Sequence, residues 1–192
     1  MINRLKNNPI YLIILYGIIS ATLTFLITLQ NGPFIDSLLN EAASTNPDGI
    51  GILKNLAISF GVFISFFNPA YYILFTGFLF WFVILMLGQD ITYKNCLLPV
   101  SWVYSISMVT FVIKVIYNSF LGSTSTLIDE TVLGKETIID MIRTHYGPFN
   151  ILFFALVSYL LYKHSKINHY ILIGFLALNL NLAISYVFSL IL

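Results

Sequence analysis

Long apolar runs dominate this sequence and restrict its possible folds more than any other feature. The first run, residues 10–29, has 20 residues. As an α-helix it would measure about 30 Å, which is the thickness of the hydrocarbon core of a bilayer. Charged residues make up only 9% of the chain, against about 25% in soluble domains. We therefore predict an integral membrane protein whose residues 1–192 form a single membrane domain.

The apolar runs predict an all-α, polytopic membrane helix bundle with five spans. One long run, residues 50–87, is interrupted by Asn68 and Pro69, which are favourable residues at the N-cap and first position of a helix. We expect a helix to begin there, preceded over residues 50–67 by an amphipathic interfacial helix or an additional span. Pro99 would lie in the first turn of the third span. The predicted spans cover residues 10–29, 70–87, 97–120, 148–162 and 169–192.

The positions of the basic residues orient these spans. With either five or six spans, the Lys and Arg residues divide five against four between the two sides of the membrane. The total count therefore does not fix the orientation. The short loops do, because they weigh most in the positive-inside rule. Five spans place the residues near Arg4, Lys94 and Lys163 together on the cytoplasmic side. We therefore predict the N-terminus inside and the C-terminus outside.

Few polar residues lie inside the predicted spans, where such groups are candidates for function. Lys114 could bind an anionic head group or a partner carboxylate, although a lysine near the end of a span commonly extends to the interface. Asn179 and Asn181 lie near the middle of the last span and would hydrogen-bond to other helices or mediate oligomers. A solute pathway lined by these three residues is the alternative interpretation.

The sequence contains no motif of a familiar catalytic or cofactor site. GxSxG, HExxH, Walker A and GxGxxG are all absent, and no pair of carboxylates lies in a predicted span. His145, His164 and His169 are not spaced to share one helical face, and Cys96 is the single cysteine. A net charge of +1 without a basic run argues against nucleic-acid binding. We expect a non-enzyme with no catalytic residue, no cofactor and no metal site.

The loop at residues 88–95 is the most distinctive polar segment. Asp90 can cap the end of the helix before the loop, and Lys94 stands where the next helix begins. A simple turn between helices explains both residues, and a docking site for a partner is the functional alternative.

The loop contains Gly88 and the step Thr92-Tyr93-Lys94, and Pro99 follows early in the next span. With these residues the loop resembles that of the Yip1 family of small polytopic membrane proteins. The family pattern has a glycine in the loop, a Ser/Thr–aromatic–Lys step and a span with an early proline. A second matching block, residues 147–152, precedes two closely linked final spans, and the resemblance covers about residues 53–190.

The resemblance implies five spans with the N-terminus inside and the C-terminus outside. The short segment before the first span is similar to that of bacterial members, which implies a location in the bacterial cytoplasmic (inner) membrane. Some of these members accompany ABC-type exporters. We therefore expect a non-enzymatic scaffold or accessory protein that acts on a membrane-protein partner, or as a homo-oligomer, among membrane lipids. The alternative is a transporter or channel-like protein for a small solute or lipid.

Overall fold

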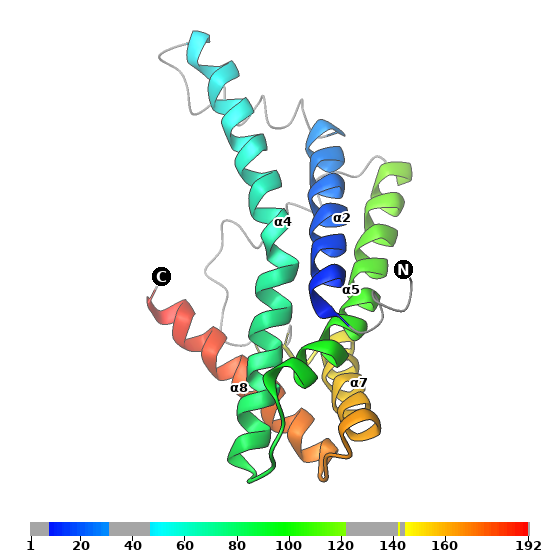
Figure 1. The fold of residues 1–192 in the computed structure, drawn as a ribbon. Helices are drawn as coiled ribbons and strands as arrows, with labels where there is room; N and C mark the ends of the chain where they lie inside the picture. Colours follow the sequence, from blue (N-terminus) through cyan, green and yellow to red (C-terminus); the bar gives the residue numbers. More distant parts are fainter. Residues whose placement is uncertain (1–7, 31–46, 122–141, 143–144, 192) are drawn as a thin grey trace.

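A computed structural model describes residues 8–30, 47–121, 142 and 145–191 of the chain. Within these residues the protein is all-α, as predicted, and none of them forms a strand. The helices run in alternating directions along the chain and pack around the longest of them (Figure 1). They are α2 (Pro9–Gln30), α4 (Pro47–Met86), α5 (Tyr93–Leu121), α7 (Pro148–Ser165) and α8 (Tyr170–Ile191).

The second apolar run forms one continuous helix. α4 has 40 residues and passes through Asn68 and Pro69 without ending. The predicted helix start at these two residues is therefore wrong, and residues 50–67 are not a separate interfacial helix. Proline removes one backbone donor, but membrane helices tolerate this loss where neighbouring helices pack around the site. Pro69 is fully buried, and α4 changes direction near its middle (Figure 1), as expected for a helix with an internal proline.

The start of α5 also differs from the prediction. The helix begins at Tyr93 rather than at residue 97, so Pro99 lies in its interior instead of its first turn. The Tyr93 hydroxyl donates to the carbonyl oxygen of Leu74 in α4 at 2.7 Å. The Trp81 indole N–H donates to the carbonyl oxygen of Ile91 at 3.1 Å. These two bonds hold the beginning of α5 against α4, and α5 bends close to this end (Figure 1).

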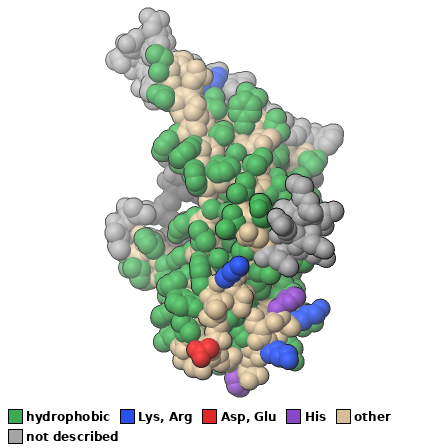
Figure 2. Space-filling model, viewed as in Figure 1, with side chains coloured by type: hydrophobic (Ala, Val, Ile, Leu, Met, Phe, Trp, Pro, Cys, Tyr) green, Lys and Arg blue, Asp and Glu red, His purple; other side chains and the backbone are tan. Residues whose placement is uncertain are grey.

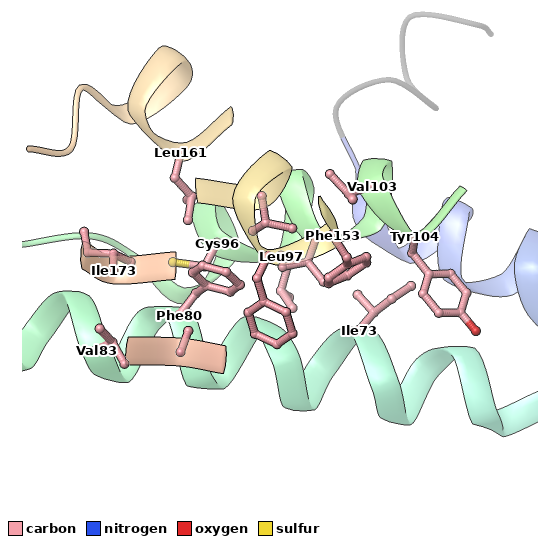
Figure 3. Close-up of a cluster of buried hydrophobic side chains, with 14 of the residues drawn as sticks. Ile73, Phe80, Val83, Cys96, Leu97, Val103, Tyr104, Phe153, Leu161 and Ile173 are labelled. Carbon is pink, nitrogen blue, oxygen red and sulfur yellow. The ribbon is translucent and has the colours of Figure 1, made fainter. Parts of the chain in front are cut away.

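The packing divides α4 into two halves. α2 lies beside its N-terminal half, and α5, α7 and α8 pack against its C-terminal half (Figure 1). No described side chain between residues 51 and 68 is buried, whereas Ile73, Phe80 and Ile84 are completely buried. Side chains from α4, α5, α7 and α8 fill the core around them (Figure 3). In that core the rings of Phe80 and Phe154 stack with centroids 5.5 Å apart.

Small residues bring α2 close to α4. A Cβ added to Gly17 would lie 2.6 Å from the backbone carbonyl oxygen of Phe66, so the two helices approach to a distance that only glycine permits. Further along the same contact, the Thr24 hydroxyl donates to the Ser65 hydroxyl at 2.9 Å. Such close packing with interhelical hydrogen bonds is typical of helices that associate in a membrane.

Among the described residues, four helices are long and apolar enough to cross a membrane, which indicates an integral membrane protein. α7 has 18 residues but is not among them, since Lys163, His164 and Ser165 in its last turn lower its mean hydropathy. The predicted span at residues 148–162 therefore stays a prediction. The candidate spans are Pro9–Leu29, Lys54–Met86, Tyr93–Ile113 and Tyr170–Leu190.

Candidate functional site

Two loops are joined at one end of the bundle, the loop from α4 to α5 and the loop from α7 to α8. The Gln89 side chain bridges them, because its Nε2 donates to the Asn168 carbonyl oxygen at 3.2 Å and its Oε1 accepts from the Asn168 backbone N–H at 3.1 Å. Gly88 (φ 72°) and Lys166 (φ 53°) adopt the left-handed conformation that commonly ends helices. The end of α4 is thus closed by its own backbone, and Asp90 is not needed as the cap.

Charged side chains gather at this end, which we call the charged end (Figure 2). Asp90 and Lys94, predicted as partner contacts, are both exposed, and so are Lys163, His164 and Lys166. Three lysines against one aspartate give these described residues a positive balance. The rest of the described surface in this view is mainly hydrophobic, with one further basic side chain at the opposite end (Figure 2).

A cavity of about 510 Å³ opens at the charged end, between the start of α5 and the end of α7. We call it the α5–α7 cavity. Its volume falls in the range of roughly 300–1,000 Å³ that is common for small-molecule sites. One part of its lining is polar and the other apolar. The polar residues are Asn95, Lys163, His164 and Ser165, and the apolar residues are Leu98, Pro99, Trp102 and Leu160.

The other predicted site residues lie apart from the charged end. Asn179 in α8 accepts a hydrogen bond from the Tyr146 hydroxyl at 2.6 Å and donates to the Phe175 carbonyl oxygen at 2.7 Å. Asn179 therefore ties α8 to the residues just before α7. Asn181 is half-buried. Lys114 belongs to α5, but its side chain lies outside what the structure describes.

The histidines are divided between two places. His145 Nε2 lies 3.2 Å from the Ser185 hydroxyl of α8, whereas His164 and His169 belong to the end of α7 and the loop after it. Among the residues that the structure describes, no group of three or more His, Cys, Asp or Glu side chains could hold a metal ion.

Sequence reasoning missed a cluster of tyrosines where α2, α4 and α5 meet. The ring centroid of Tyr104 is 5.5 Å from that of Tyr16 and 5.3 Å from that of Tyr72. The Tyr16 hydroxyl donates to the Ser101 carbonyl oxygen at 3.1 Å. Membrane tyrosines usually gather at the interfaces. The position of Tyr16 and Tyr104 inside apolar runs could therefore have identified them as helix contacts. A hydroxyl at that depth needs a partner, and here it links helices.

The chain matches no family model, no curated protein and no solved structure. The resemblance to the Yip1 family therefore rests on its two short motifs and has no further support.

Proposed function

We propose that this chain is a non-enzymatic membrane scaffold or accessory protein that packs against a helix of a membrane partner. The observation that carries the proposal is a row of large apolar side chains on the N-terminal half of α4. Their exposed fractions run from 49% to 64%. The row, which we call the α4 stripe, consists of Leu56, Phe60, Phe63 and Phe67.

The spacing of the α4 stripe is that of a helix-packing seam. Its members follow one another at intervals of four, three and four residues, as the a and d positions of a coiled coil do. Ser65, which bonds to Thr24 of α2, comes two residues after Phe63 and so lies on the opposite side of α4. The α4 stripe therefore faces away from α2 and is open to a second helix.

The length of α4 supports a protein partner in addition to lipid. Its 40 residues measure about 60 Å at 1.5 Å per residue, twice the hydrocarbon thickness of about 30 Å. Even at a tilt of about 40°, the upper end of the usual range, the helix would extend about 46 Å along the membrane normal. Within that range of tilt, part of this apolar helix lies beyond the acyl chains, and a partner helix would cover it.

The proposal includes the five-span topology, in which α7 is a span in addition to the four candidate helices, in a bacterial cytoplasmic membrane. The alternating directions of the five described helices (Figure 1) support five crossings. The two loops of the charged end would face the cytoplasm with the N-terminus, and the C-terminus would lie outside. Asp90 and Lys94 would then be accessible to a cytoplasmic part of the partner. An ABC-type exporter is the first partner to test, and a second copy of the chain is the next.

Transport of a small solute or lipid is kept as the alternative. Asn179, one of the residues expected to line a path, is already hydrogen-bonded to Tyr146 and Phe175. Its amide thus serves to hold α8 in place, and we favour the scaffold function.

Photo-crosslinking in native membranes tests the proposal. A photoreactive residue replaces Phe63 in one variant and Phe175 of α8, the matched control, in another, since their exposed fractions are 60% and 57%. The Phe63 variant should form an adduct with one defined protein, identified by mass spectrometry, and the control should react mainly with lipid. Equal protein adducts from both variants, or none from the Phe63 variant, would refute a partner at the α4 stripe.

A further inference from the structure

We propose that the α5–α7 cavity binds the phosphate of an anionic membrane lipid. This inference is independent of the α4 stripe, because it concerns a different surface at the charged end. It rests on a cavity in which basic and apolar side chains face the same space.

The polar side of the cavity favours an anion. Lys163 and His164 line it, and the described charged end has three lysines but a single acidic side chain, Asp90. Asn95 lies in the first turn of α5, where the positive end of the helix dipole also favours negative charge. A phosphate is the anion that a membrane surface presents most abundantly to such a group.

The apolar side of the cavity favours a phosphate that carries acyl chains. Leu98, Trp102 and Leu160 form a wall next to the basic residues, and Trp102 is 43% exposed. Tyr159 and Tyr162, each 47% exposed, stand on the same last turns of α7, and exposed tyrosine and tryptophan mark the level of the membrane interface. A soluble phosphate would use the polar residues alone, whereas a lipid would use both sides.

Tryptophan fluorescence gives a direct readout, because the chain has only two tryptophans. The Trp81→Phe variant leaves Trp102, which lines the cavity, as the single indole. This variant is reconstituted in phosphatidylcholine vesicles with increasing fractions of phosphatidylglycerol whose brominated acyl chains quench a nearby indole. Brominated phosphatidylcholine serves as the neutral comparison. Half-maximal quenching should need about fivefold less brominated phosphatidylglycerol than brominated phosphatidylcholine. This factor is the effect of roughly one lysine near an anionic surface.

Two lysine variants separate the cavity from general surface charge. Lys163→Gln removes a cavity cation and should abolish the fivefold preference. Lys166→Asn removes a charge from the neighbouring loop, outside the cavity lining, and asparagine accepts the left-handed conformation at this position (φ 53°). The Lys166→Asn variant should keep the preference. Equal quenching by the two lipids, or an equal loss in both lysine variants, would overturn the proposal.

Competition with glycerol 3-phosphate distinguishes a lipid from a soluble phosphate ester. Millimolar glycerol 3-phosphate should leave the quenching unchanged, and its reversal would show that the cavity takes a soluble phosphate instead of a lipid. Native mass spectrometry of the unmodified chain with the same two lipids repeats the test without the Trp81 substitution. Retention of phosphatidylcholine and phosphatidylglycerol in equal numbers would again overturn the proposal. No partner protein is present in these experiments, so their failure is distinct from failure of the scaffold function.

Discussion

Replacing Gly17 by alanine should destabilise the protein by forcing α2 away from α4. The new Cβ would lie 2.6 Å from the Phe66 carbonyl oxygen and 3.2 Å from two carbons of the Phe66 ring. Ordinary contacts of a Cβ begin at 3.4 Å, so the oxygen and the Cβ must separate by about 0.8 Å to reach a usual packing distance. A backbone oxygen cannot rotate away as a side chain can, and the whole interface between the helices has to adjust.

The magnitude follows from two opposing effects. Overpacking of a closely packed site costs about 1–3 kcal/mol, while alanine in place of glycine in a helix contributes about 0.5–1 kcal/mol of stability. We expect Gly17→Ala to lower the free energy of unfolding by about 1 kcal/mol, within the range of about 0–2.5 kcal/mol that the two effects allow. Gly61→Ala is the matched control in α4, because no atom lies within 4 Å of its added Cβ. Only the favourable effect acts there, and this variant should be more stable by about 0.5–1 kcal/mol.

Titration with sodium dodecyl sulfate in mixed micelles, followed by circular dichroism, measures both changes. The expected order of stability is Gly61→Ala, then the unmodified chain, then Gly17→Ala. A Gly17→Ala variant as stable as Gly61→Ala would refute the close approach of α2 to the α4 backbone.

Three further predictions concern single interactions. Tyr16→Phe removes the hydrogen bond to the Ser101 carbonyl oxygen but keeps the ring. It should lower the free energy of unfolding by about 1 kcal/mol in the same titration, and an unchanged stability would contradict that bond. Gln89→Ala removes the acceptor of the Asn168 backbone N–H, so hydrogen exchange of that amide should accelerate about tenfold. An unchanged exchange rate would contradict the Gln89 bridge between the two loops. Cys96 is completely buried, so a maleimide should label it only after the protein unfolds, and rapid labelling of the folded protein would contradict its burial.

The sequence predicted helices well where no proline interrupts an apolar run. The runs at residues 10–29 and 169–192 correspond to α2 and α8 to within one residue. The pair Asn68–Pro69 gave a strong local signal for a helix start, yet α4 continues through it. Local preference is a weak guide where surrounding helices pack against the chain, and the complete burial of Pro69 depends on contacts that the local sequence does not contain.

The candidate site was only partly predictable. Asp90 and Lys94 were identified because charged residues are rare in this chain, and both are exposed at the charged end. The Gln89–Asn168 bridge joins residues 79 positions apart, and the α5–α7 cavity exists because the start of α5 packs beside the end of α7. Periodicity shows which residues share a helical face, but it does not show which helices become neighbours.

The bond between Tyr16 and Ser101 also sets an order of assembly. Its acceptor is made 85 residues after its donor, and at about 5–20 residues per second the ribosome needs roughly 4–17 s to reach it. During that interval the first helix is complete while its hydroxyl still lacks its final acceptor. α7 and α8, joined by the four residues between Ser165 and Tyr170, can pair as soon as the second of them is made. α2 therefore waits for α5, and α4 waits longer still, because it also packs against α8, which begins only at Tyr170.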